Sequence, residues 1–192
     1  MPKSVPGRAG FAAAAAWLAS AASAQEVVRY GIEGSDFPIS ESVAVPPGAE
    51  TVFVSGAVPR AIVEGGDRTD TATFGDMEAQ TVSVLEAIEA RLERLGLGMG
   101  DVVMMRAYLV GEGQDDLMDF AGFMRGYTQF FGTADQPNLP ARSALQVAGL
   151  AAPGWLVEIE VVAARVPCGA TCTPFRGTEG APIVEMEGEI DR

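Results

Sequence analysis

The chain has 192 residues, a formal net charge of −13 at pH 7 and no histidine. This length suits one domain with a sizeable core and short extensions. A strongly acidic surface repels phosphate backbones, so we expect no nucleic-acid partner. The absence of histidine excludes a histidine-based triad and histidine-ligated metal sites. Chemistry must come from arginine, carboxylates, hydroxyls and backbone groups.

Residues 1–24 are predicted to be an export signal. Lys3 and Arg8 precede an apolar run, and Ala22-Ser23-Ala24 fits a signal-peptidase site with cleavage before Gln25. The run is too short to span a bilayer as a helix, although an uncleaved anchor is the alternative. We expect a periplasmic or secreted protein with no membrane segment after cleavage. Loss of Lys3 and Arg8 would change the net charge from −13 to −15 and remove the only lysine, which excludes a lysine Schiff base.

The next part of the chain, residues 25–165, is predicted to be one α+β domain. Alternating β-branched and apolar residues indicate strands, and apolar residues at intervals of three and four indicate helices. The glycine-rich run over residues 96–100 follows a helix and precedes a strand, so it is a connection rather than a phosphate-binding loop. The order predicts two helices on one face of a mixed sheet. The expected strands cover residues 27–32, 42–45, 51–56, 102–110, 140–148 and 156–162, and the expected helices cover residues 76–95, capped by Asp76, and 116–131.

Residues 166–192 are predicted to be an acidic extension, rich in glycine and proline, outside the core. Cys168 and Cys172 lie in this extension, and in an oxidising compartment we expect them to close a short disulfide loop. A metal or redox site is the weaker alternative, because the spacing is not Cys-x-x-Cys and the sequence has no second ligand pair.

Arg142 and Glu158 are the candidate chemical groups. They lie on consecutive predicted strands separated by a Pro153-Gly154 turn, so we expect the arginine to lie near the carboxylate on a neighbouring strand. An arginine can hold a planar carboxylate by two parallel hydrogen bonds, and a carboxylate can accept a proton from an attacking water. On spacing alone, an ordinary ion pair is the commoner explanation of this pattern.

Several short motifs occur along the chain in an order typical of one family. The most specific combination is Pro140-Ala141-Arg142-Ser143 with Val157-Glu158-Ile159-Glu160. The other pieces are Phe53-Val54-Ser55-Gly56-Ala57-Val58-Pro59, the helix over residues 80–95, Gly100-Asp101-Val102-Val103, and Asp119-Phe120 through Tyr127 to Phe130-Phe131. Together they cover residues 36–165 and resemble the Rid family, also called YjgF or the reactive-intermediate deaminases.

The resemblance implies a chorismate-mutase-like fold assembled as a homotrimer, with sites between subunits. It implies hydrolysis of reactive enamines and imines, such as 2-imino acids, to 2-keto acids and ammonia, without a metal or organic cofactor. Arg142 would bind the carboxylate of a small-molecule substrate, and Glu158 would position or activate water. The residues that would line the pocket are Ser55, Gly56, Ile39, Met124, Tyr127 and Ala144.

Two of these positions depart from the family pattern. Ile39 stands where a tyrosine is often found, and Met124 stands in place of an asparagine. Both changes make the expected pocket less polar, which favours a bulkier or more apolar substrate, or binding without catalysis. The alternatives are therefore a non-catalytic trimeric binding protein for small carboxylates and a hydrolase of a related C–N bond. Ribonuclease activity, also attached to this family, ranks last because of the negative charge.

Overall fold

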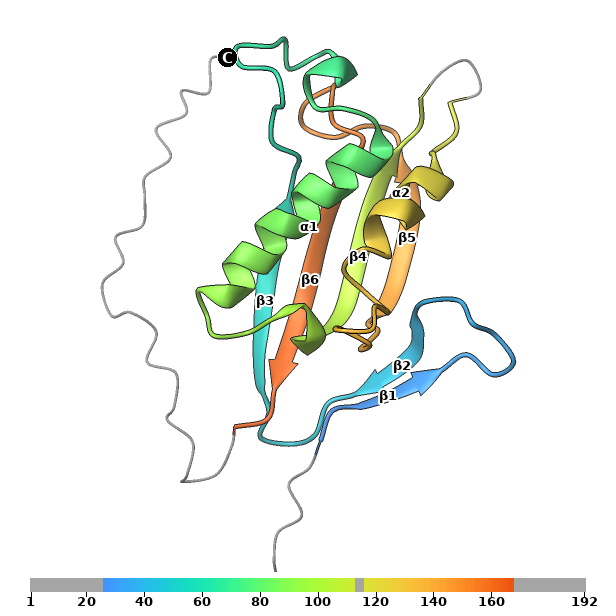
Figure 1. Ribbon diagram of the computed structural model, residues 1–192, viewed down its shortest axis with the longest axis vertical. Coiled ribbons are helices and arrows are strands. Elements are labelled where there is room, and N and C mark those ends of the chain that lie inside the picture. The colour runs from blue at the N-terminus through green and yellow to red at the C-terminus, as the bar shows by residue number, and fades with distance from the viewer. Residues whose placement is uncertain (1–25, 113–115, 168–192) are drawn as a thin grey trace, which may run out of the picture.

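The computed structural model describes residues 26–112 and 116–167. They form a six-stranded mixed sheet in the order β1-β2-β5-β4-β6-β3, with two α-helices on one face (Figure 1). The predicted α+β class is confirmed. The strands are β1 (Val28–Gly31), β2 (Ser40–Ala44), β3 (Glu50–Ala57), β4 (Val102–Val110), β5 (Ala141–Val147) and β6 (Val157–Arg165). The helices are α1 (Met77–Glu93) and α2 (Phe120–Tyr127), with short 3-10 helices η1 (Thr71–Thr73) and η2 (Met99–Asp101).

α1 begins at the predicted cap. The Asp76 side chain accepts a hydrogen bond from the Ala79 N–H at 2.9 Å and so satisfies a backbone donor that the first helical turn leaves free. Gly96, with a φ of 65°, follows the helix in the left-handed conformation that glycine adopts readily. Between these ends, one face of the helix is buried and forms the core with the sheet. Its buried residues are Met77, Gln80, Thr81, Val84, Leu85, Ile88 and Leu92.

α2 is shorter than the predicted helix over residues 116–131. It begins at Phe120 because Asp119, rather than Asp116, caps it by accepting a hydrogen bond from the Gly122 N–H at 2.8 Å. Leu117, before the cap, takes part in an isolated β-bridge with Glu112 instead of a helical turn. This start places the aromatic side chains of α2 close to the beginning of β5.

β5 and β6 are not neighbours, so the expectation that Arg142 lies near Glu158 is wrong within one chain. β4 lies between them, parallel to β5 and antiparallel to β6. A parallel pair needs a crossover, and α2 supplies it between β4 and β5. Residues 148–156 then carry the chain across the end of β4, a distance of two strand spacings or about 10 Å. β5 and β6 are consecutive in the sequence, but β4 lies between them in the sheet and pairs with both.

The strand register also puts Arg142 and Glu158 on opposite faces of the sheet. Arg142 pairs with Met105, which is fully buried beneath the helices. Glu158 pairs with Tyr108, one residue out of phase with the buried positions of β4. Paired residues direct their side chains to the same face, and successive residues alternate. We call the face covered by α1 and α2 the helical face and the other one the open face.

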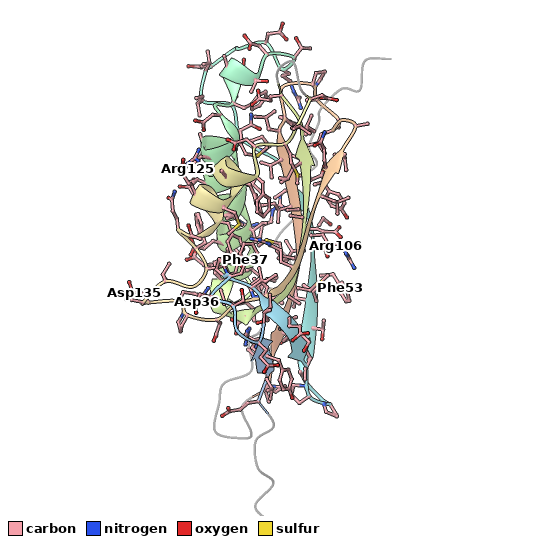
Figure 2. All side chains as sticks on the ribbon, turned by 90° about the vertical axis from the view of Figure 1, so that its right-hand side faces the viewer. Asp36, Phe37, Phe53, Arg106, Arg125 and Asp135 are labelled. Atoms are coloured by element: carbon pink, nitrogen blue, oxygen red, sulfur yellow. The ribbon has the colours of Figure 1, made fainter. Side chains whose placement is uncertain are left out.

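The open face carries both charged and aromatic side chains. Figure 2 shows Phe53 and Arg106 on this face, and Asp36, Phe37 and Arg125 on the side of the helices. Phe53 is 80% exposed, which is unusual for a phenylalanine in a central part of a strand. No helix within residues 26–112 and 116–167 covers this face (Figure 2).

The remaining sequence predictions concern the two ends of the chain and membrane-spanning segments. The predicted export signal over residues 1–24 and the pair Cys168 and Cys172 lie outside the part of the chain that the structure describes. Within the described part, neither helix is long and apolar enough to cross a membrane.

Candidate functional site

Arg142 lies among four aromatic rings on the helical face. Its guanidinium carbon is 4.2 Å from the ring centre of Tyr127 and 5.1 Å from that of Phe123, both on α2. The ring centres of Phe37 and Phe120 lie at 5.6 Å and 5.9 Å from the same carbon. All four distances are within the range of a cation–π contact. We call these four residues the aromatic cage.

The Arg142 guanidinium has no carboxylate partner in the described part of the chain. Its Nη1 atom is buried without a hydrogen-bond partner, and Arg142 takes part in none of the ion pairs. Burial lowers the pKa of Arg142, and the neighbouring Tyr127 opposes that shift. Partial burial of a charge is costly, and the cation–π contacts with the cage offset part of that cost. The group is therefore suited to accept an anion from outside the chain.

Hydrogen bonds hold the cage in place around Arg142. The Tyr127 hydroxyl donates to the Pro38 carbonyl at 2.9 Å, which ties α2 to the segment before β2. The Ser40 N–H donates to the Pro140 carbonyl at 2.9 Å, and the Ser40 hydroxyl donates to the Leu139 carbonyl at 2.7 Å. These bonds join the start of β2 to the start of β5, next to Arg142. The cage and Arg142 thus come from three separate segments of the sequence, namely the segment before β2, α2 and β5.

The other residues predicted near Arg142 lie in the same region. Ile39 and Met124 are half-buried, on the segment before β2 and on α2 respectively. Ala144 follows Arg142 by two residues on β5 and shares its face. Tyr127 is fully buried beneath the guanidinium, so it supports Arg142 instead of forming an open wall. Burial raises the pKa of Tyr127, and Arg142 opposes that shift, so the phenol stays protonated.

Glu158 forms a second, separate group with Ser55 and Gly56. The register between β3 and β6 shifts between Val54 and Ala57, so Ser55 and Gly56 form a bulge opposite β6. A Cβ added at Gly56 would collide with the Glu158 carboxylate, which shows how closely the strand backbone approaches that side chain. The predicted site residues therefore fall into two half-sites. The arginine half-site contains Arg142, Ile39, Met124, Tyr127 and Ala144, and the glutamate half-site contains Glu158, Ser55 and Gly56.

A family model described as "Endoribonuclease L-PSP" matches residues 40–165, which include the glutamate half-site and all of the arginine half-site except Ile39. The chain belongs to this family, which is also known as YjgF or Rid. A RutC family protein of Pyrococcus abyssi is 33% identical over 126 residues, covering 66% of this chain and 85% of that protein. A protein of Salmonella typhimurium named 2-iminobutanoate/2-iminopropanoate deaminase is 34% identical over 114 residues, covering 59% of this chain and 79% of that protein.

Solved structures agree with the family assignment. A Rid family protein of unknown function from Yersinia pestis matches with a TM-score of 0.53 and 26% sequence identity. The match covers 73% of this chain and 98% of that structure. The predicted YjgF fold is therefore confirmed for this Rid protein.

Sequence reasoning missed a charged network on the open face of this Rid protein. Arg106 donates to Glu160 at 2.6 Å, and the Tyr108 hydroxyl donates to the same carboxylate oxygen at 3.2 Å. The hydrogen bond with Glu160 raises the pKa of Arg106. Polar residues that alternate along two strands meet when those strands pair. The sequence contains this alternation, but only the strand order shows that β4 and β6 pair.

Sequence reasoning also missed Arg91, which supports the glutamate half-site. Its Nη1 donates to the Ser55 carbonyl at 2.9 Å, so α1 holds the bulge from the helical side. Arg91 and Arg94 line a shallow pocket that also contains Ser55 and Gly56. In the described part of the chain, no three carboxylate or thiol side chains come together as a candidate metal centre.

Proposed function

We propose that this Rid protein hydrolyses 2-imino acids to 2-keto acids and ammonia, with Arg142 holding the substrate carboxylate. The observation that supports it best is the half-buried Arg142 side chain, whose Nη1 atom is buried and has no hydrogen-bond partner within the described residues. A carboxylate can satisfy this group through charge-assisted hydrogen bonds. The similarity to a protein named as an imine deaminase supports the choice of reaction.

We also propose that the complete site forms between two copies in a homotrimer. Arg142 and Glu158 of one chain point to opposite faces, so a cleft that contains both needs the arginine half-site of one subunit and the glutamate half-site of another. The exposed Phe53 supports self-association through the open face. A closed ring satisfies this requirement because each subunit then contributes one half-site to each of two clefts.

The proposed reaction needs a positioned water and a protonated imine. Water attacks the iminium carbon as Glu158 accepts one of its protons, and the C=N electron pair moves to nitrogen to give a carbinolamine. Glu158 returns the proton to nitrogen, the C–N bond breaks with its electron pair going to nitrogen, and the hydroxyl gives its proton to Glu158 as the keto group forms. Transfer of that proton to the departing ammonia gives ammonium and regenerates the Glu158 carboxylate. Arg142 contributes by fixing the carboxylate and thereby the orientation of the reacting carbon.

The test is release of ammonia and keto acid from imino acids that an amino-acid oxidase generates in situ. We expect the protein to accelerate release over buffer, and Arg142→Ala to lose about tenfold to a few hundredfold in kcat/KM. Arg142→Lys should recover little, because a lysine lacks the planar fork. No acceleration by the wild-type protein with any of several substrates would refute the proposal.

A binding protein for small carboxylates is the second candidate, favoured by the apolar Ile39 and Met124 on the two segments that carry the aromatic cage. Calorimetry would then show carboxylate binding without turnover, and Glu158→Gln would leave the affinity nearly unchanged. Ammonia release from amides and carbamates would instead indicate a hydrolase of a related C–N bond. RNA cleavage is not proposed, because the net charge of −13 opposes binding to a phosphate backbone.

Export to the periplasm or the medium is proposed on the sequence of residues 1–24 alone. Expression of the full chain followed by cell fractionation and amino-terminal sequencing tests it. A mature protein that begins at Gln25 in the exported fraction is expected. A cytosolic protein that retains its amino terminus would contradict this proposal and leave the chemistry of the site unaffected.

A further inference from the structure

We propose that the arginine half-site selects substrates with a large apolar or aromatic side chain, and that Phe37 determines this selection. The turnover part of this inference rests on the proposed function, whereas the binding part does not. Phe37 was not among the predicted site residues. It stands out because its ring contributes to the aromatic cage and is also 40% exposed.

Phe37 is held firmly although its ring is exposed. The Ile39 N–H donates to the Phe37 carbonyl at 2.7 Å across Pro38, whose ring restricts the backbone. The Phe37 N–H donates to the Ser35 hydroxyl at 3.1 Å. Together with the bond from Tyr127 to the Pro38 carbonyl, these contacts fix the segment that carries Phe37. An exposed aromatic ring on a fixed backbone is a preorganised contact surface rather than a loosely held side chain.

The rings near Arg142 form an apolar surface beside the guanidinium. Phe37 and Phe120 stack with ring centres 6.5 Å apart and an interplanar angle of 15°. Phe120, Ile39 and Met124 are half-buried, so each keeps part of its surface accessible. A carboxylate bound to Arg142 would therefore have its attached carbon chain against aromatic and aliphatic side chains. Such a surface stabilises a substrate in proportion to the apolar area that it covers.

The charges in the same segments oppose a second anionic group on the substrate. Asp36 precedes Phe37 and Asp119 precedes Phe120, and both are exposed. The Asp119 carboxylate accepts from the Gly122 N–H at 2.8 Å and lies 3.9 Å from Arg125. These carboxylates would repel a dicarboxylic imino acid. The half-site therefore favours monocarboxylic substrates whose remaining part is apolar.

The first test compares kcat/KM for 2-imino-3-phenylpropanoate with kcat/KM for 2-iminopropanoate. We expect the larger substrate to be preferred by about tenfold or more, the range that a few buried methylene groups provide in a hydrophobic pocket. Phe37→Ala should lower this ratio severalfold, and Phe37→Leu should have a smaller effect. Ile62→Ala is the matched control, because Ile62 is an exposed apolar residue on the loop before α1 and outside both half-sites. It should leave the ratio unchanged.

The second test does not depend on turnover. Calorimetry with phenylacetate and acetate measures the same preference in the wild-type protein and in Phe37→Ala. If the protein is inactive but binds phenylacetate more tightly through Phe37, the deaminase proposal fails and this inference stands. Equal affinities for the two acids, or a preference that Phe37→Ala leaves intact, would overturn it. A change in oligomeric state by light scattering with an unchanged preference would also overturn it, because Phe37 would then contact another subunit.

Discussion

Arg106 and Arg142 lie at almost the same position along two neighbouring strands, but they lie on opposite faces of the sheet and differ in burial and in their partners. In the register between β4 and β5, Arg106 pairs with Ser143, the residue next to Arg142. Arg106 is exposed on the open face and donates to Glu160, which raises its pKa. Arg142 is enclosed by the aromatic cage, and burial lowers its pKa. Arg106 has its carboxylate partner within the chain, and we propose that Arg142 binds a carboxylate that arrives from outside.

The largest expected effect is at Arg142, where an apolar replacement should abolish carboxylate binding and raise the free energy of unfolding. Arg142→Met should abolish carboxylate binding by calorimetry, since the guanidinium that the cage surrounds is removed. The same change should raise the free energy of unfolding by about 1 kcal/mol, because apolar replacement of a buried charged group is often neutral or stabilising. Urea unfolding measures it. A loss of 2 kcal/mol or more would indicate that Arg142 is a structural residue satisfied by contacts between subunits.

The next prediction tests whether the two faces come together only between subunits. Arg142→Ala and Glu158→Gln should each be nearly inactive when assembled alone. When the two variants are unfolded, mixed in equal amounts and reassembled, about a quarter of the clefts should combine an intact Arg142 with an intact Glu158 from different chains. Activity should recover to a comparable fraction of wild type. Mixing the same proteins without unfolding is the control, and no recovery after reassembly would contradict a site shared between subunits.

A smaller effect is expected at Tyr127, which supports the arginine half-site from below. Tyr127→Phe removes the hydrogen bond to the Pro38 carbonyl and should cost about 1 kcal/mol in the free energy of unfolding. Because burial raises the pKa of Tyr127, its contribution is fully present below about pH 10, where an unfolded tyrosine is still protonated, and is lost as the pH rises above that value. Urea unfolding at pH 8 and pH 11 tests both statements.

The control for Tyr127 is Tyr30→Phe, since Tyr30 is 53% exposed. Wild type and Tyr30→Phe should lose stability between the two pH values, whereas Tyr127→Phe should lose less. An equal loss in all three proteins would show that Tyr127 does not titrate differently in the folded and unfolded states. It would also weaken the view that the cage is a rigid support for Arg142.

The sequence predicts where strands and helices lie along the chain better than it predicts which strands pair. Val102–Val110 and the Asp76 cap are local patterns, and both are found where they were expected. The separation of β5 from β6 depends on contacts between distant segments, which periodicity does not contain. The same limit explains why Phe37 was missed, since its proximity to Arg142 follows from the hydrogen bonds that join β2 to β5. Motifs identified Arg142 and Glu158 singly, but only the register showed that they face apart.

The smallest expected effect concerns the exposed ion pair between Arg106 and Glu160. Glu160→Gln weakens the ion pair with Arg106 and keeps a hydrogen-bond acceptor for Tyr108, so it should change the free energy of unfolding less than Tyr127→Phe does. Because exposed ion pairs are screened by salt, the difference from wild type should shrink between 0.05 M and 1 M sodium chloride.

Arg60 and Glu86 form another exposed pair, at 3.8 Å, so Glu86→Gln is a matched control away from the open face. A salt-independent loss for Glu160→Gln that exceeds this control, together with a change in oligomeric state, would mean that the Arg106–Glu160 pair is buried when subunits assemble. The open face would then be the subunit interface, and the contrast with Arg142 would lie in where each arginine finds its partner.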